Sequence, residues 1–272
     1  MVNLMNKERL ISTSKEVRKD IIEMLYESKS GHPGGSLSCA DIMTYLYFEK
    51  MNVNVENPKD ENRDRFVLSK GHAAPALYAV LAEKGFFNKE ELISLRKIGA
   101  MLQGHPDAKK IPGVDVSTGS LGQGISNAVG MALGLKHKKS NSKIYTLLGD
   151  GEVQEGLVWE AAMAAGHYKL DNLVAILDYN GLQIDGKNEE VMSISPIDKK
   201  FESFGWNVVI CDGHDYDDIN RAFSEVISGK PTVIIAKTVK GKGVSFMENQ
   251  AGWHGQAPNL EQKETAIADI YK

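Results

Sequence analysis

Two turns rich in carboxylate and amide side chains follow two apolar runs in the middle of the chain. Gly149-Asp150-Gly151 comes directly after the run at residues 143–148, and Asp178-Tyr179-Asn180-Gly181 follows residues 172–177. Short apolar runs bounded by turn residues predict buried parallel strands. We therefore expect Asp150 and Asn180 to project from the same edge of a sheet, the edge at which open α/β sheets bind ligands.

These residue types indicate a particular chemistry at that edge. A carboxylate and an amide oxygen are hard ligands of the kind that Mg²⁺ prefers, and they leave coordination positions free for phosphate oxygens. Gly149 and Gly151 allow a bulky anion to approach the backbone closely. Gly, Asp and Asn are also ordinary turn residues, so the pattern is equally compatible with a metal–diphosphate site and with two plain turns.

Four of the seven histidines adjoin a glycine in a predicted loop, namely His32, His72, His105 and His254. Imidazole hydrogen-bonds sugar hydroxyls and phosphates and transfers protons near neutral pH. Any one of these residues could simply bond the backbone, but four such settings in one chain favour a functional set. We interpret His137 as part of a solvated helix end, His167 as a packed or surface residue, and His214 as part of a turn and helix start.

The elements that would position these side chains alternate along the chain. Helices are predicted at residues 7–28, 40–50, 73–84, 125–138, 153–168, 196–204 and 216–227, strands at 65–69, 143–148, 172–177, 206–211 and 232–237, and loops at 32–36, 99–124 and 238–259. This alternation predicts an α/β fold, a doubly wound and mostly parallel sheet with helices on both faces. Ser38 is expected to cap the helix at 40–50. A loop as long as 99–124 is usually functional.

Composition narrows the class of protein. The 272 residues are 42% hydrophobic and 25% charged, as in globular proteins. A formal charge of −4 gives no support for nucleic-acid binding. Cys39 and Cys211 lie far apart without metal or redox spacing, which predicts buried thiols in a reducing compartment. With no apolar run of about 18 residues and with charges at residues 7–9, we expect no membrane span or signal peptide, and a cytoplasmic protein.

Six stretches, in order along the chain, resemble the N-terminal, diphosphate-binding part of transketolase, a thiamine-diphosphate enzyme. They are Ser30-Gly31-His32-Pro33-Gly34, Ser69-Lys70-Gly71-His72, Gly104-His105-Pro106, Thr118-Gly119-Ser120-Leu121-Gly122-Gln123-Gly124, Gly149-Asp150-Gly151 through Asn180, and Trp253-His254-Gly255. The Gly-Asp-Gly to Asn pattern is typical of the thiamine-diphosphate superfamily, and the histidine set with Leu121-Gly122-Gln123-Gly124 narrows the resemblance to transketolase. The resemblance implies a single thiamin diphosphate-binding domain, of the type that holds the diphosphate, over residues 1–272.

The resemblance also implies a role for each matching residue. Asp150, Asn180 and the backbone carbonyl of Leu182 would hold Mg²⁺, for which Ca²⁺ or Mn²⁺ can substitute. The expected contacts of thiamine diphosphate are His72, Gly119, Ser120, Leu121, Gly151, Asn180 and His254, together with Glu155, which resembles an acid of the carboxylate network between subunits. His32, His105 and His254 would be catalytic and face the sugar. Ser120 stands where many transketolases have proline.

A full transketolase continues beyond this part with a pyrimidine-binding domain and a C-terminal domain. These supply the glutamate that activates the cofactor, the aromatic residue that stacks on it, and the cations that hold the substrate phosphate. We therefore expect an N-terminal subunit that a C-terminal partner subunit completes, in an α2β2 heterotetramer. It would transfer a two-carbon ketol unit from a ketose phosphate to an aldose phosphate, as in the pentose phosphate pathway.

Three alternatives remain beside this expectation. One is a subunit of a deoxyxylulose-phosphate synthase-like enzyme, which Ser120-Leu121-Gly122 disfavours. Another is a 2-oxo-acid dehydrogenase-like subunit, which the set of His32, His105 and His254 disfavours. A third is a non-catalytic regulatory subunit that keeps the fold, which the joint presence of metal-type ligands and loop histidines disfavours.

Overall fold

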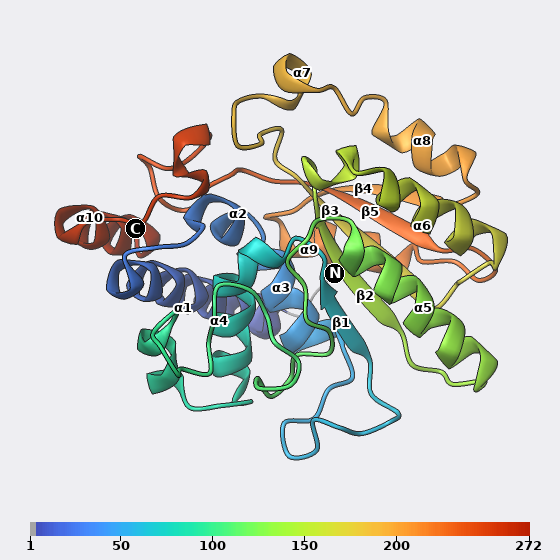
Figure 1. The fold of residues 1–272 in the computed structure, drawn as a ribbon, viewed down its shortest axis with the longest axis horizontal. Coiled ribbons are helices and arrows are strands. Elements are labelled where there is room, and N and C mark those ends of the chain that lie inside the picture. Colours follow the sequence, from blue (N-terminus) through green and yellow to red (C-terminus); the bar gives the residue numbers. More distant parts are fainter. Residues whose placement is uncertain (1–3) are drawn as a thin grey trace.

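A computed structural model describes residues 4–272 of the chain. Its strands are β1 (Arg65–Leu68), β2 (Ile144–Gly149), β3 (Leu173–Tyr179), β4 (Asn207–Asp212) and β5 (Thr232–Lys237). They form a five-stranded sheet in the order β1-β2-β3-β5-β4, and every neighbouring pair is parallel (Figure 1). The β2–β3 register pairs Gly149 with Asp178, so the two predicted turns leave the sheet side by side.

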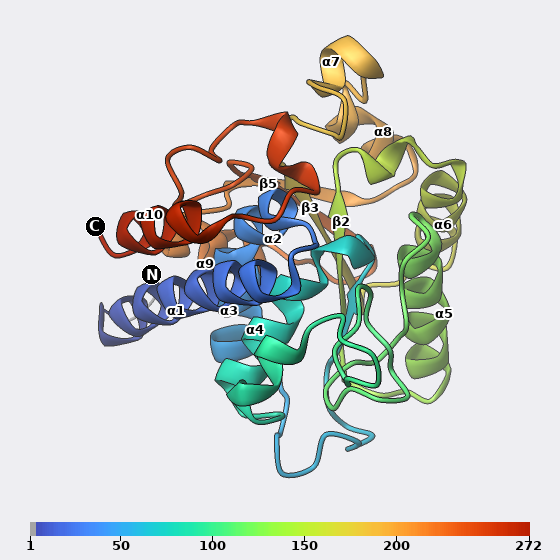
Figure 2. The same cartoon turned by 60° about the vertical axis from the view of Figure 1, so that its left-hand side comes forward.

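Helices cover both faces of this sheet. They are α1 (Leu4–Ser28), α2 (Pro33–Ser38), α3 (Ala40–Tyr45), α4 (Ala74–Lys84), α5 (Gln123–His137), α6 (Gly156–His167), α7 (Asn188–Val191), α8 (Ile197–Ser203), α9 (Tyr216–Ser224) and α10 (Leu260–Ile270). Figures 1 and 2 show α5 and α6 side by side on one face, with α1, α3 and α4 on the other.

Two apolar clusters hold these layers together, one on each face of the sheet. Successive strand residues point to opposite faces, so Tyr145 and Leu147 join the cluster of α1, α3, α4 and α9, while Ile144 and Leu148 join that of α5, α6 and α8. Burying both faces explains why the strands read as continuous apolar runs. The predicted fold class, a doubly wound α/β sheet, is confirmed.

The segment after His32 was wrongly predicted to be a loop. Residues Pro33–Ser38 form the short helix α2, which Pro33 can open because the first helical residue needs no N–H partner. Ser38 does not cap the next helix. Its hydroxyl is buried and donates to Asp178 at 2.5 Å, so a tertiary contact has replaced the local one.

Other boundaries differ more modestly. The helix predicted at 40–50 is α3 followed by a π-helical turn, η1 (Leu46–Lys50), and α9 ends at Ser224 rather than at residue 227. The terminal helix α10, which Asn259 and Gln262 begin with a reciprocal capping box, was not predicted.

Both cysteines are buried and free, as expected. Across residues 4–272, each helix is too short or too polar to cross a membrane.

Candidate active site

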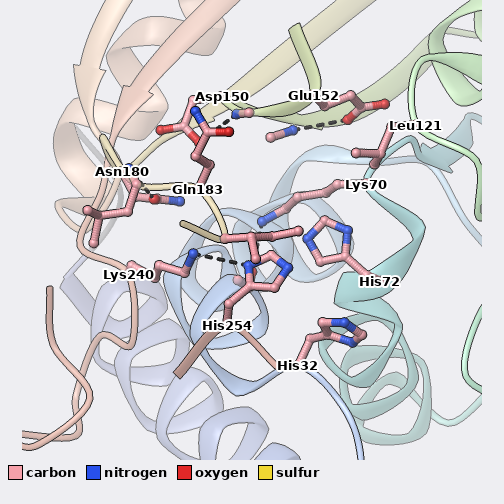
Figure 3. A pocket seen from close by; sticks show the side chains of 15 residues that line it. His32, Lys70, His72, Leu121, Asp150, Glu152, Asn180, Gln183, Lys240 and His254 are labelled. Atoms are coloured by element: carbon pink, nitrogen blue, oxygen red, sulfur yellow. Dashed lines mark hydrogen bonds between the residues drawn. The ribbon is translucent and has the colours of Figure 1, made fainter. Parts of the chain in front are cut away.

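A cavity of about 260 Å³ opens at the carboxyl edge of β2 and β3 (Figure 3). Eight of the residues expected at the site line it, namely His32, His72, Leu121, Asp150, Gly151, Asn180, Leu182 and His254. Seven further residues complete the wall, namely Gly35, Lys70, Gly149, Glu152, Gln183, Ile184 and Lys240. The turns after two neighbouring strands, the α2 region and the loop after β5 thus converge on one space.

The two turns are joined directly by hydrogen bonds. The Asp150 carboxylate accepts the N–H of Gly181 at 2.6 Å and that of Gly151 at 2.9 Å. The Asn180 amide oxygen accepts the N–H of Leu182 at 3.1 Å. Burial, reinforced by the charge of Asp178, raises the pKa of Asp150 to about 6. The expectation that Asp150 and Asn180 share an edge is confirmed.

Glycines leave room where the backbone borders the cavity. A Cβ on Gly151 would lie 3.2 Å from the Cβ of Gln183, and one on Gly149 would lie 3.5 Å from the Lys70 side chain. One on Gly35 would lie 3.5 Å from the His72 ring. Side chains at these positions would fill the space that an anion could enter.

A buried ion pair lies beneath the cavity. Lys70 donates to Asp178 at 2.5 Å and to the Gly35 carbonyl at 2.7 Å. Asp178 also accepts from Ser38, from Thr238 and from the Asn180 amide. Burial disfavours the charged form of each side chain. The attraction and hydrogen bonding between Lys70 and Asp178 outweigh this effect, so the pKa of Lys70 is raised and the pKa of Asp178 is lowered.

A second lysine, Lys240, lies beside a group of three imidazole rings. The rings of His32, His72 and His254 form a triangle with every centroid distance equal to 5.3 Å. Lys240 Nζ lies 3.1 Å from His254 Nδ1 (Figure 3), which must accept because an ammonium only donates. Burial lowers the pKa of Lys240 to about 8. Burial and Lys240 lower the pKa of His254 to about 4.

His32 marks the outer end of this group. Burial and the charge of Arg96 lower its pKa to about 4. Its Nδ1 is buried and has no hydrogen-bond partner among residues 4–272, as expected of an atom that awaits a ligand. His105 lies outside the cavity wall and is exposed, but burial of part of its ring and Arg96 lower its pKa too. Gly119 lies beside it, since a Cβ added to this glycine would lie 3.5 Å from the ring.

Three expected cofactor residues lie outside the cavity wall. These are Gly119, Ser120 and Glu155. The Glu155 side chain is exposed and close to Gly122, whose added Cβ would lie 3.2 Å from that of Glu155.

Sequence reasoning missed four charged residues at or near this site. Lys70, Glu152 and Lys240 line the cavity, and Arg96 acts on its histidines. Lys70 and Lys240 stood in glycine-rich motifs, a signal that could have found them. Nothing in the sequence distinguishes Arg96 from other surface arginines.

Taken together, these residues define an α/β protein whose sheet edge is lined by side chains suited to an anion and a hard cation. Asp150 and the Asn180 amide oxygen suit a hard cation, while Lys70, Lys240 and the glycine-lined backbone suit a phosphate group. Neutral imidazoles beside such a group can accept protons from a bound hydroxyl.

Comparison of the chain with known proteins identifies the family to which it belongs. Residues 7–269 match the family described as "Transketolase, thiamine diphosphate binding domain". The chain therefore belongs to the transketolase family. It is 47% identical over 268 residues to one subunit of the apulose-4-phosphate transketolase of Phocaeicola vulgatus, with 98% of this chain and 95% of that one covered. It is 45% identical to one subunit of the 6-deoxy-6-sulfo-D-fructose transketolase of a Clostridium species, with 94% of both chains covered.

Solved structures agree with this assignment. Transketolase from Leishmania mexicana superimposes with a TM-score of 0.93 at 31% identity and covers 97% of the chain. The chain spans only 41% of the length of that transketolase, whereas it spans nearly all of the two single subunits.

Proposed function

We propose that this chain is the diphosphate-binding subunit of a split transketolase, which transfers a two-carbon ketol unit from a ketose phosphate to an aldose phosphate. The observation that carries the proposal is the meeting, in one cavity, of the Asp150–Asn180 turns with His32, His72 and His254. The match to two subunit chains over nearly their full length supports it.

The residues of the cavity fit thiamine diphosphate and Mg²⁺. Asp150, Asn180 and the Leu182 carbonyl would hold the metal, with Ca²⁺ or Mn²⁺ able to substitute, because all three offer oxygen ligands. Lys240 and His72 line the same cavity, and we expect both to contact that diphosphate.

The remaining cofactor contacts would come from backbone and loop residues, namely Gly119, Ser120, Leu121, Gly151 and His254, with Glu155 at the interface between subunits. When bound, thiamine diphosphate supplies the nucleophilic carbon that allows the C2–C3 bond of a ketose to break. The protein holds the reactants and moves protons. His32 and His254 are neutral at pH 7 because their pKa values lie near 4, so each can accept a proton from a sugar hydroxyl. Such a positioned base contributes roughly 10²–10⁴ in rate.

His105 completes the set of sugar-facing side chains in this proposal. Its exposed ring beside Gly119 would contact the sugar farther from the cofactor. The two similar subunits carry names of sugars with an acidic group, a phosphate in one and a sulfo group in the other. Sugars with an anionic tail are therefore the proposed substrates, with the tail directed toward the partner chain.

A C-terminal partner subunit would carry the pyrimidine-binding and C-terminal domains, and residues 1–272 would form a single domain. Two similar chains of matching length are each named as one subunit of a transketolase, which supports a partner. The pairwise sites of the family favour an α2β2 heterotetramer. The buried free thiols of Cys39 and Cys211 favour a reducing, cytoplasmic setting.

The test combines this chain with its candidate partner. The mixture, with Mg²⁺ and thiamine diphosphate, is assayed for two-carbon transfer from a ketose phosphate or a ketose sulfonate to an aldose phosphate, and its mass is measured in solution. We expect transfer only when both chains are present. Transfer by this chain alone would refute the split site, and a stable complex that binds cofactor without transfer would favour a regulatory subunit.

A further inference from the structure

Lys240 enters the cavity from a loop whose backbone contacts a row of three side chains that lie outside the cavity. Arg18 belongs to α1, Asp41 to α3, and His214 to the turn between β4 and α9. Two guanidinium nitrogens of Arg18 donate to the Asp41 carboxylate at 2.9 and 2.6 Å. His214 Nδ1 lies 2.7 Å from the same carboxylate. We call this row the Arg18–Asp41–His214 clamp.

Each end of the clamp binds the backbone on one side of Lys240. The N–H of Val239 donates to His214 Nε2 at 2.9 Å, and Arg18 Nε donates to the carbonyl of Lys242 at 3.1 Å. Because Nε2 accepts, the proton of the neutral imidazole is on Nδ1, which therefore donates to Asp41. The carboxylate thus links two contacts that lie three residues apart in the loop.

The clamp is buried although it does not reach the cavity. Arg18 and Asp41 are each 6% exposed, and the His214 side chain is 13% exposed. Burial opposes the charge of Asp41, but Arg18 and His214 outweigh it and lower the pKa of that carboxyl. The expected turn and helix start at His214 are confirmed, with Asp215 as the cap of helix α9, and the contacts of His214 with Asp41 and Val239 come in addition.

Lys240 needs such support because its position is costly. Its side chain is long and flexible, and the residue is only 2% exposed. A buried ammonium loses hydration, and the side chain that Lys240 meets within hydrogen-bond distance is His254, which is neutral. A loop free to move would let the ammonium turn outward into water.

We propose that the Arg18–Asp41–His214 clamp positions Lys240 in the candidate active site by fixing the backbone on both sides of it. The three members are positioning residues, because none lines the cavity. The proposal rests on the proposed function only in taking Lys240 to bind the cofactor diphosphate.

The first experiment follows amide hydrogen exchange in the isolated chain. His214→Ala removes the acceptor of the Val239 N–H, so exchange in residues 238–250 should rise about tenfold, the effect of losing one buried hydrogen bond. His214→Gln should restore part of the protection, because its amide oxygen can reach Val239. Tyr45→Phe is the matched control. It removes a different side-chain hydrogen bond, from Tyr45 in α3 to Asn220 in α9 at 2.8 Å, which does not involve the loop.

The second experiment uses the complex with the partner chain and titrates thiamine diphosphate in the presence of Mg²⁺. His214→Ala should raise the half-saturating cofactor concentration about fivefold to tenfold and change kcat at saturation much less. His214→Gln should fall between His214→Ala and the unmodified chain, and Tyr45→Phe should change neither quantity.

The results of the two experiments distinguish failure of the clamp proposal from failure of the proposed function. Unchanged exchange at residues 238–250 in His214→Ala, or an equal rise in Tyr45→Phe, would overturn the clamp. Raised exchange with unchanged cofactor saturation would also overturn it, because Lys240 would then not depend on the loop. If the unmodified complex transfers no ketol unit while exchange responds as expected, the proposed function fails and the clamp on the loop remains.

Discussion

The hydroxyl of Ser69 donates to the carboxylate of Glu152 at 2.5 Å, inside the protein and beside the cavity. The same carboxylate accepts the N–H of Gly122 at 2.9 Å and that of Gly149 at 3.1 Å. One side chain therefore joins the segment before His72, the segment after Leu121 and the end of β2. These are three of the backbone segments that the cofactor is expected to contact.

Replacing Glu152 with glutamine should loosen all three segments. Both carboxylate oxygens accept hydrogen bonds, and glutamine places an N–H₂ group against one of the donors. We expect a loss of about 1–3 kcal/mol in unfolding free energy for the isolated chain, measured by urea denaturation, and weaker thiamine diphosphate binding by the complex. Glu202→Gln, on the exposed face of α8, should change stability by less than about 0.5 kcal/mol. Equal losses in both variants would contradict this role of Glu152.

The sheet edge was predictable because its signals are local. β2 and β3 are short apolar runs bounded by glycine and lysine or asparagine, and such runs specify buried parallel strands without knowledge of their neighbours. Parallel pairing then places the residue after each strand at one edge. Asp150 and Asn180 could for this reason be placed together from spacing alone.

The remainder of the site depends on tertiary contacts that spacing does not reveal. Pro33-Gly34-Gly35 has low helix propensity, and α2 forms because its six residues are all buried. The hydroxyl of Ser38 does not cap a helix as expected but donates to Asp178, which lies 140 positions away in the sequence. His214 lies in the expected turn, but nothing local predicts its bonds with Asp41 and Val239 across the fold. Contacts between distant segments decided each of these cases.

Asp150→Asn should abolish metal-dependent cofactor uptake by the complex. Loss of an outer-sphere partner alone costs about 10–100-fold in metal affinity, so loss of the proposed carboxylate ligand should cost about 100-fold or more. Calorimetric titration of Mg²⁺ with thiamine diphosphate present measures this effect. Asp171→Asn, at the opposite end of β3, should leave uptake intact. Normal uptake by Asp150→Asn would remove the basis for the proposed metal site.

Two glycine-to-alanine substitutions should have opposite effects on the isolated chain. A Cβ on Gly71 would lie 2.9 Å from backbone atoms of Thr118 and Gly119, which must then move. We expect about 1–3 kcal/mol of destabilisation, as for other overpacked sites. Gly134 lies within α5 with nothing within 4 Å of an added Cβ, so Gly134→Ala should stabilise by about 0.5–1 kcal/mol. Urea denaturation midpoints of the two variants measure these effects. A Gly71→Ala chain as stable as the unmodified one would show that the backbone at residues 118–119 moves aside at no cost.

The stability of the isolated chain should depend on pH through two half-buried histidines, His32 and His254. His32 and His254 have pKa values near 4 in the folded chain, mainly because burial disfavours their charged forms, against about 6.5 when unfolded. Between these values the unfolded chain binds more protons, so unfolding free energy rises with pH. This contribution is complete above about pH 6.5 and is lost as pH falls toward 4.

The double variant His32→Gln, His254→Gln isolates this effect from that of other groups. Asp150, whose pKa is raised to about 6, contributes with the opposite sign in part of the same range, but it is present in both chains. The difference in unfolding free energy between the unmodified chain and the double variant should therefore shift in favour of the variant as pH falls from 6.5 to 4. Urea denaturation at half-unit pH steps measures it. Parallel curves across this range would mean that the two imidazoles titrate as they do in water, and that the cavity does not hold them neutral.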